Sequence, residues 1–542
     1  MRPINSIQYA KSIILLFVVS FFSTMLSAQT APPIQWKKSF GGTNHDEARA
    51  VVNTSDGGFM IGGFTTSSDI DITGSKGGGD AWVIKVDSNG AIQWKKIYGS
   101  ALGESGYDLI ATRDGNFLLA ANATANGGDV SGYHPNGVQL NTPDVWIVKF
   151  DDNGNIIWQN CYGGAGKERV YAVAQTHDGG YAIVATTDSS DADVSGYHKG
   201  PDVNATDIWL IKIDSLGVLK WQRCLGGSDH DRPLDIIATK DKGLVIAGFA
   251  KSNDGDVTTA KGKNDAWVIK TDSLGTTTWQ KNYGGTENDN AAAIVECVDG
   301  GYMLMAATSS NNGDVTTLKG KICTWAVRLN DTGKVLWDKS YGGSESELAK
   351  GVIQTPDSGF VFISETNSND QDVSVGKGNF DWWIHKTDQQ GVLKWEKSLG
   401  TLLSDRIEGI TLAKDGYVCV GYMYDNSGDL LNEHKGLGDW VVVKLKENFK
   451  GGGGTTTISN NVLVPNIRVY PSPTSGLVNI ELSQGYENAE LKVYDMMGKL
   501  LQVNIKQQGA VRTVDLSQFA SGRYTIQVIY GEQASSYKVL KQ

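Results

Sequence analysis

The sequence has few prolines, few cysteines and no cluster of basic residues. Its 542 residues include only 11 prolines, and the formal net charge is −11. Nucleic acids are bound by concentrated basic surfaces, so this charge balance argues against a nucleic-acid partner. Beyond the N-terminal 28 residues, no stretch is both long and apolar enough to cross a bilayer. We therefore expect no transmembrane segment in the mature chain.

The cysteines form neither a disulfide framework nor a zinc pattern. There are five, an odd number, which leaves at least one thiol unpaired in an exported protein. Cys161 and Cys224 occupy equivalent positions in successive repeats, and such positions are too far apart to bridge. No CxxC or Cys/His spacing is present. We expect buried free thiols at Cys161, Cys224, Cys297, Cys323 and Cys419.

Motifs for catalysis are also missing. The chain has only seven histidines and contains neither GxSxG nor HExxH. We expect no catalytic residues and no cofactor, with calcium as the one alternative considered below.

A tryptophan that closes each unit is the dominant pattern of the chain. It recurs at intervals of 58 to 64 residues, which predicts a repeat array or propeller rather than a conventional domain. The seven positions are Trp36, Trp94, Trp158, Trp221, Trp279, Trp337 and Trp395.

Each repeat contains four strand signals, which we call a, b, c and d. In the first repeat they cover residues 47–54, 58–66, 80–87 and 91–98. Asp-Gly turns such as Asp56-Gly57 join a to b, and equally short turns join c to d. These short turns predict that each repeat folds as a four-stranded antiparallel meander. The small residues of strand a suit an innermost position, and the tryptophan of strand d suits the wider outer region.

The seventh unit lacks strand d, and the matching strand stands at residues 34–40. Pairing of this N-terminal strand with the last unit would close a ring and remove an open sheet edge. The sequence therefore predicts an all-β chain with a seven-bladed β-propeller over residues 34–446. A linear solenoid is the alternative, and the split seventh unit argues against it.

The two ends of the chain predict export. Residues 1–28 have the charged start, short apolar run and small-residue site of a secretory signal, with cleavage after Ala28. A flexible Gly/Thr-rich linker, 447–464, precedes a second β domain at 465–542.

This second domain contains the segments VYPSPTSGLVNIEL (469–482), LKVYDMMGKLL (491–501), VDLSQFASGRYTIQV (514–528) and the final YKVLKQ. In these segments it resembles the C-terminal sorting domain of the type IX secretion system of Bacteroidetes-type bacteria. The resemblance implies a seven-stranded β-sandwich, recognition by the type IX machinery as a partner, and passage through the periplasm. The product would be secreted or held on the outer cell surface of a Gram-negative bacterium.

The repeats resemble those of quinoprotein-type propellers in architecture. The resemblance rests on the DxxGxxxW pattern, as in 331–337. No adjacent cysteine pair supports quinone chemistry, so no activity is implied.

Acidic residues recur on the face expected to carry the b–c and d–a loops. One set precedes strand a and is predicted to ring the channel mouth: Asp46, Glu104, Glu168, Asp231, Asp289, Glu347 and Asp405. A second set follows strand b: Asp71, Asp129, Asp193, Asp256, Asp314, Asp372 and Asp429.

Two interpretations of these acids remain. Calcium favours several oxygens at close spacing, which makes Asp254 and Asp256 weak candidates. Alternatively, the acids accept hydrogen bonds from loop amides, hydroxyls and the indoles of strand c tryptophans such as Trp82. Repetition in all seven units favours the second, structural interpretation, and no EF-hand spacing is present.

A cation recurs inside strand c, where a buried charge is expected to be paired. We predict structural pairing with acids for Lys85, Lys149, Lys212, Lys270, Arg328, Lys386 and Lys444.

Only the second and third repeats depart in length, in their b–c loops 129–144 and 193–207. Each loop contains a Tyr-His pair: Tyr133 with His134, and Tyr197 with His198. Exposed tyrosines in adjacent loops would suit a sugar or protein ligand. A simple loop extension with packed tyrosines is the alternative, and the sequence does not choose between them.

The first functional hypothesis is an exported propeller that binds a glycan or protein ligand. The alternative is a secreted polysaccharide-active hydrolase or lyase that uses carboxylates at the channel mouth, where paired carboxylates need a fixed separation.

Overall fold

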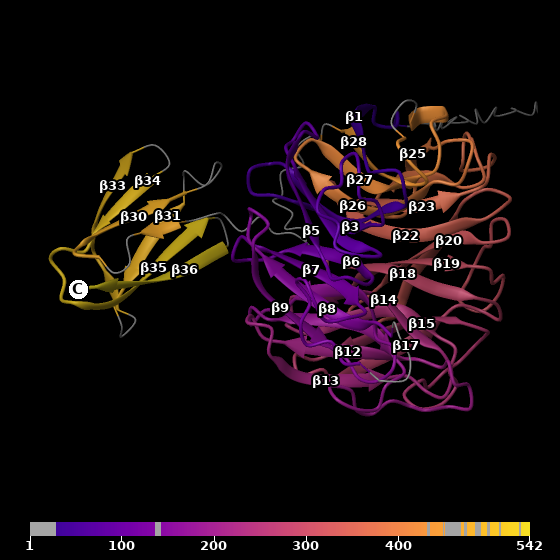
Figure 1. Cartoon of the computed structure of the whole chain (residues 1–542), viewed down its shortest axis with the longest axis horizontal. Coiled ribbons are helices and arrows are strands. Elements are labelled where there is room, and N and C mark those ends of the chain that lie inside the picture. The colour runs from indigo at the N-terminus through magenta and orange to yellow at the C-terminus, as the bar shows by residue number, and fades with distance from the viewer. Residues whose placement is uncertain are drawn as a thin grey trace, which may run out of the picture.

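The computed structural model describes residues 29–135, 142–430, 434–447, 449, 468–470, 474–482, 489–495, 499–508, 511–530 and 533–542. The predicted signal peptide with Ala28, and most of the predicted linker, lie outside this range. Apart from the short 3-10 helix η1 (Gly428–Leu430), the regular structure is antiparallel β-sheet (Figure 1).

Seven four-stranded sheets build the first domain, and we call them blades 1 to 7. Strands run from a to d in each blade. Blades 1 to 3 are β2 (Asp46–Asn53), β3 (Phe59–Thr65), β4 (Asp80–Val86), β5 (Ile92–Tyr98); β6 (Glu104–Ala111), β7 (Phe117–Ala123), β8 (Asp144–Phe150), β9 (Ile156–Tyr162); and β10 (Arg169–Gln175), β11 (Tyr181–Thr187), β12 (Asp207–Ile213), β13 (Leu219–Leu225).

Blades 4 to 7 follow the same order. They are β14 (Asp231–Ala238), β15 (Leu244–Ala250), β16 (Asp265–Thr271), β17 (Thr277–Tyr283); β18 (Asp289–Glu296), β19 (Tyr302–Thr308), β20 (Cys323–Leu329), β21 (Val335–Tyr341); β22 (Glu347–Gln354), β23 (Phe360–Thr366), β24 (Asp381–Thr387), β25 (Leu393–Leu399); and β26 (Arg406–Ala413), β27 (Gly416–Met423), β28 (Asp439–Lys446), β1 (Ile34–Phe40).

The blades form a closed ring. Strand a of each blade contacts strand a of the next, and β26 contacts β2. The N-terminal β1 pairs antiparallel with β28, so it is the outer strand of blade 7, as predicted (Figure 1). The seven sheets are compatible with the seven-bladed prediction.

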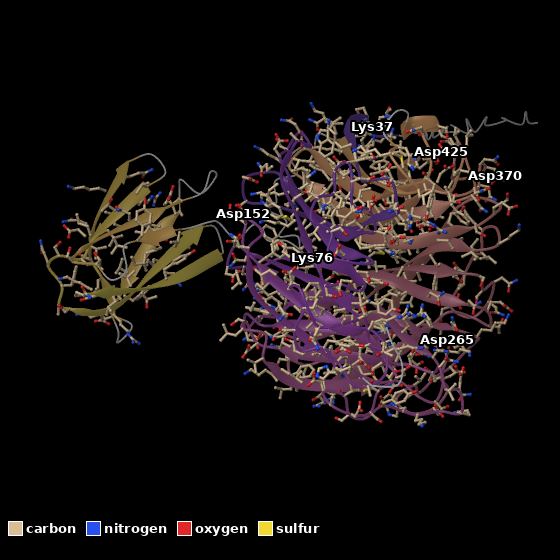
Figure 2. All side chains as sticks on the ribbon, in the orientation of Figure 1. Lys37, Lys76, Asp152, Asp265, Asp370 and Asp425 are labelled. Atoms are coloured by element: carbon tan, nitrogen blue, oxygen red, sulfur yellow. The ribbon has the colours of Figure 1, made fainter. Side chains whose placement is uncertain are left out.

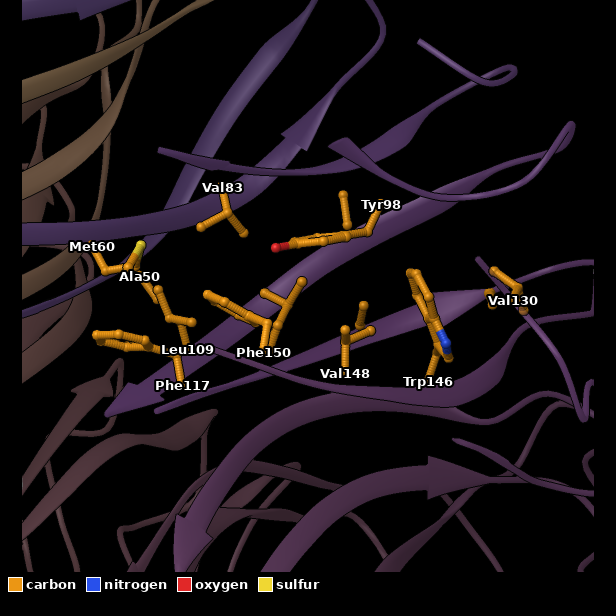
Figure 3. Packing of buried hydrophobic residues seen from close by; sticks show 14 of the residues in the cluster. Ala50, Met60, Val83, Tyr98, Leu109, Phe117, Val130, Trp146, Val148 and Phe150 are labelled. Atoms are coloured by element: carbon orange, nitrogen blue, oxygen red, sulfur yellow. The ribbon is translucent and has the colours of Figure 1, made fainter. Parts of the chain in front are cut away.

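The hydrophobic core is divided among the junctions between neighbouring blades. One cluster of buried side chains fills each junction, and Figure 3 shows the one between blades 1 and 2, with Met60 and Val83 facing Phe117, Trp146 and Phe150. Strand c tryptophans such as Trp146 are fully buried. Truncation of an aromatic side chain at such a site typically costs about 3–5 kcal/mol, so each blade is stabilised mainly by its neighbours.

The strand d tryptophans hold the outer edges together. The indole of Trp36 donates to the carbonyl of Ser88 in the c–d turn of blade 1, and a Cβ on Gly90 would lie 3.0 Å from the Trp36 ring. Gly90 also has a φ of 78°, which favours glycine. The same contact joins Trp94 to the turn of blade 2. This places the tryptophans in the outer region, where the sequence predicted them.

The repeated cations and the cysteines are also where the sequence predicted them. All five cysteines are buried and unpaired. Each strand c cation forms an ion pair with the aspartate of the a–b turn in its own blade; the pairs include Lys85–Asp56, Lys149–Asp114, Lys212–Asp178, Lys270–Asp241, Arg328–Asp299, Lys386–Asp357 and Lys444–Asp415.

The C-terminal domain has two sheets that share one hydrophobic cluster. Their orders are β29 (Arg468–Tyr470), β30 (Leu477–Glu481), β34 (Val511–Asp515), β33 (Asn504–Gln508), and β32 (Leu500–Leu501), β31 (Glu490–Tyr494), β35 (Gly522–Tyr530), β36 (Gln533–Lys541). The resemblance implied seven strands. The described residues form eight, because the two-residue β32 pairs with β31 and completes the second sheet.

We expect deletion of residues 29–40 to destabilise the ring, because β28 would lose its partner and become an open edge. The thermal midpoint of the purified chain should fall by about 5 °C or more, and light scattering should detect association. A truncated chain that stays monomeric with an unchanged midpoint would contradict the closure.

Candidate functional site

The loops of neighbouring blades meet on one face of the ring, as the strand order predicted. Gly79 in the b–c loop of blade 1 accepts the amide of Glu104, which follows the d–a loop. Glu168, Asp289 and Asp405 donate in the same way to carbonyls before strand c of the preceding blade. Both loop types therefore lie at the end of the ring where strand a begins.

The first set of acids lies inside the junctions between blades, and this corrects the predicted position at the channel mouth. At most 2% of any of the seven side chains is exposed, and none lines the central cavity. Each carboxylate accepts the backbone amide of the residue four positions earlier, as Asp46 accepts from Gly42 at 2.7 Å. Hydroxyls such as Ser67 add a second donor.

Among the described residues, no strand c indole donates a hydrogen bond to these acids. Trp146 donates to Gln159 at 2.7 Å and Trp267 to Gln280 at 2.6 Å, both on strand d of the same blade. In these blades a cross-strand pair within the sheet replaces the expected indole–acid contact, whereas Trp440 of blade 7 donates to the Phe64 carbonyl of blade 1.

Each acid of the second set joins two blades. All seven accept a glycine amide of the d–a loop 30 or 29 positions earlier. Five also pair with a lysine of the preceding blade, as Asp129 does with Lys76, which Figure 2 labels.

Asp254 and Asp256 use their carboxylate oxygens within the loops. Asp254 Oδ1 accepts the Ser228 amide at 2.7 Å, and Asp256 Oδ2 accepts the Gly226 amide at 3.2 Å. In blade 5 the neutral Asn312 fills the place of Asp254 and accepts the Thr286 amide at 2.9 Å. A negative charge is thus not required there, and calcium binding at these two residues stays a prediction.

One potential metal-binding group arises where the long loop of blade 3 meets the d–a loop of blade 4. Ligand atoms of Asp202, Asp229 and His230 lie within 4.8 Å of one another, the one such group among the described residues. Sequence reasoning missed it because Asp202 is distant in the chain. The side chains are partly exposed, and Asp229 is already paired with Lys251 at 2.9 Å.

The Tyr-His pairs of the two long loops are built into their own blades. The Tyr133 hydroxyl donates to the Thr142 carbonyl at 3.0 Å, and that of Tyr197 donates to Ala205 at 2.9 Å. Both rings are half-buried against the junction clusters. These contacts favour packed tyrosines over free stacking surfaces.

The two histidines stand where other blades have lysine. The backbone amides of His134 and His198 donate to the aspartate that opens strand c, as the Lys76 amide does in blade 1. His134 Nε2 lies 3.9 Å from Asp193, in place of the lysine–aspartate pair. The extra loop length hides this equivalence in the sequence.

A central cavity of about 2130 Å³ runs along the seven inner strands. Its lining reaches from Arg49 near the loop-bearing end to Asp56 in the opposite a–b turn. Each inner strand has a register shift at the same place, which is a β-bulge that redirects one side chain. The bulged residues are Arg49, Tyr107, Tyr171, Leu234, Ala292, Lys350 and Glu408.

These seven bulged residues, which we call the bulged ring, differ from blade to blade, whereas the acids of the junctions are repeated in every blade. Blades 1 to 3 present Arg49, Tyr107 and Tyr171, with the two tyrosine rings 6.4 Å apart. Blades 4 and 5 present only the smaller Leu234 and Ala292. All five line the cavity, so its wall is aromatic at blades 2 and 3 and carries small bulged side chains at blades 4 and 5.

Two carboxylates also line the cavity, next to the bulges of blades 2 and 4. Asp108 accepts the Val173 amide at 2.9 Å, and Asp235 accepts the Ile294 amide at 2.8 Å, so each ties its strand to the next blade. Burial raises the pKa of Asp235 to about 7, and the Asp108 carboxylate adds to the shift. Sequence reasoning missed both, because neither belongs to a repeated pattern.

Pairs of buried carboxylates meet at six of the seven junctions. The aspartate that opens strand c faces the acid of the next strand a, as Asp439 faces Asp46. A Cβ on Gly41 would lie 2.1 Å from Asp439 Oδ1 and 2.9 Å from Asp46 Oδ2, so glycine is needed between them. Oδ1 has no hydrogen-bond partner among the described residues in Asp80, Asp144, Asp207, Asp265, Asp381 and Asp439.

The C-terminal domain accounts for the export of the chain. Residues 468–542 match the family model of a secretion system C-terminal sorting domain. This part of the chain is a type IX sorting domain. The sorting domain implies contact with the type IX machinery and indicates export to the outer surface or the medium in Bacteroidetes-type bacteria.

Other comparisons concern the propeller. The regulatory protein FlaEY of Caulobacter vibrioides is 24% identical over 190 residues, which are 32% of this chain and only 19% of that protein. The Neurospora crassa Pan2 WD40 domain is 11% identical, covering 74% of this chain and 91% of that chain, with a TM-score of 0.37. A DUF4221 family member from Bacteroides vulgatus is 10% identical, covering 77% and 97%, with a TM-score of 0.33. None of these similarities assigns an activity.

Within the part of the chain that the structure describes, no helix has the length and apolar character needed to cross a membrane.

We expect the carboxylate pairs to make the propeller more stable at pH 5 than at pH 7.5. Burial raises the pKa of Asp144 and Asp405 to about 7 and of Asp231 and Asp439 to about 6. The folded state then binds more protons than the unfolded state, so stability falls as pH rises through these values. Thermal midpoints measured between pH 5 and 7.5 test this.

Asp439→Asn is the matched variant, because it keeps the shape and removes one charge of a pair. Its midpoint should rise at pH 7.5 and depend less on pH than that of the parent chain. A parent midpoint that climbs from pH 5 to pH 7.5 would contradict the interpretation.

Proposed function

We propose that the exported propeller binds a glycan or protein ligand at the loop-bearing mouth of its central cavity. The bulged ring carries this proposal, since its side chains differ between blades. A specific ligand needs an asymmetric surface, whereas residues repeated in every blade serve the shared scaffold. Tyr107 and Tyr171 belong to blades 2 and 3, the same blades that carry the two long loops.

Replacement of Tyr171 should weaken ligand binding while leaving the fold intact. The Tyr171 ring is half-buried at the cavity wall, next to Tyr107. Aromatic side chains of this kind contribute large, rigid contact area to sugars and proteins.

We expect Tyr171→Ala to weaken binding at least about tenfold, the loss typical of an aromatic hot spot. Affinity electrophoresis in gels containing dextran, xylan or polygalacturonate provides the readout, after a screen of the parent chain. The thermal midpoint of the variant checks folding. The double variant Tyr133→Ala/Tyr197→Ala is the control for the long loops. If the double variant loses binding while Tyr171→Ala binds like the parent chain, the site lies on the long loops instead.

A polysaccharide-active enzyme is the second candidate. The observation that favours it is Asp235, a cavity carboxylate whose pKa of about 7 suits a general acid. Against it, both oxygens of Asp235 already accept backbone amides, from Ile236 and Ile294.

We expect the parent chain to release no new reducing ends from the same three polymers during prolonged incubation. Cleavage that falls about a hundredfold or more in Asp235→Asn, with the fold retained, would favour the enzyme instead. Asp108→Asn is the companion variant, because Asp108 makes the same type of contact in blade 2.

A further inference from the structure

The charges at the cavity mouth are balanced on one side only. In blades 6, 7 and 1, three cations face three glutamates. Lys350 lies 3.0 Å from both Glu365 and Glu408, and Arg49 and Arg406 pair with glutamates of the same group, which are Glu47, Glu365 and Glu408. This side of the mouth therefore has no net charge to offer a ligand.

Blades 3 and 4 carry two arginines without such partners. Arg169 and Arg232 are exposed, and they occupy the place in strand a that Arg406 occupies in blade 7. Neither has an ion pair among the described residues. The partner of Arg406 is Glu365, at the end of strand b in the preceding blade. The matching residues are neutral, Asn122 before Arg169 and Thr186 before Arg232.

Arg232 is held in place by aromatic rings. Its guanidinium lies 5.8 Å from the Tyr171 ring centre and 5.5 Å from that of Phe249. Such stacking leaves the N–H donors at the rim of the guanidinium free for hydrogen bonds. Burial raises the pKa of Tyr171, and the positive charges of Arg232 and Arg169 both act to lower it.

We propose that Arg169 and Arg232 bind the anionic groups of an acidic polysaccharide, with Tyr171 against a sugar ring. This rests on the proposed function and names its ligand class. Arginine matches a carboxylate or sulfate with two parallel hydrogen bonds. Tyr171, under the guanidinium of Arg232 and two positions after Arg169 in the same strand, adds an apolar ring face. The net charge of −11 disfavours nonspecific binding of polyanions to the rest of the surface.

The test compares four polymers by affinity electrophoresis and by titration of the full mature chain. Polygalacturonate carries carboxylates, its methyl ester is neutral, dextran sulfate carries sulfates and dextran is neutral. We expect binding to an acidic polymer and little to its neutral counterpart. The two acidic polymers distinguish carboxylate from sulfate. Binding should weaken as salt rises from 50 to 300 mM, since screening acts on exposed charges.

Arg169→Gln/Arg232→Gln should weaken binding of the acidic polymer at least about tenfold. Arg223→Gln is the matched control. Arg223 also stacks on an aromatic ring, that of Trp221 at 5.8 Å, but it lies on the outer strand β13, away from the cavity. The affinity of the Arg223→Gln variant for the acidic polymer should stay within about twofold of the parent value. Equal thermal midpoints of the parent chain and these two variants exclude misfolding. A further variant, Arg232→Lys, tests whether binding needs the planar guanidinium or only a positive charge.

Three results would overturn the inference. The first is equal binding of acidic and neutral polymers, and the second is acidic-polymer binding that survives in the double variant or falls as much in Arg223→Gln. Binding of a neutral glycan or of a protein at the mouth, lost in Tyr171→Ala but not in the arginine variants, would overturn the inference and leave the proposed function standing.

Discussion

The contact between neighbouring blades is the interaction on which the rest of this propeller depends. Among the residues that the structure describes, each hydrophobic cluster of the propeller takes side chains from two neighbouring blades, so the blades share their cores. The acids that sequence reasoning placed at the channel mouth lie in these same junctions. There they accept loop amides and face a second carboxylate, so the junction combines apolar burial with a polar network that is sensitive to protonation. Repetition in every blade is the natural result of a junction that must be made seven times.

The sequence predicts the features that belong to this repeated junction. The period of the tryptophans identifies the blades, and the displaced 34–40 strand identifies the closing partner of β28. Pairing of strand c cations follows from the cost of burying a charge alone. The depth of Asp46 and its relatives could not be predicted, because an acid before a strand is equally compatible with a solvent-facing loop.

The cavity wall is the part of the molecule that the sequence does not reveal. A β-bulge has no residue signature in these strands, where the bulged position is arginine, tyrosine, leucine, alanine, lysine or glutamate. Alternation of inward and outward residues therefore fails at that position, and Arg49 or Tyr171 cannot be assigned to the cavity from spacing alone. The Tyr-His pairs mislead for a related reason. Their loops are longer, yet His134 and His198 keep the lysine position of the other blades.

The pairing of β1 with β28 sets an order of events for the emerging chain. β1 (Ile34–Phe40) is synthesised first among the propeller strands and its partner β28 (Asp439–Lys446) last, so β1 lacks its partner until β28 has been made. The sorting domain at 468–542 comes after β28 and the linker, so every strand of the ring precedes it in the chain. A chain that carries the sorting domain therefore also carries all the strands needed to close the ring.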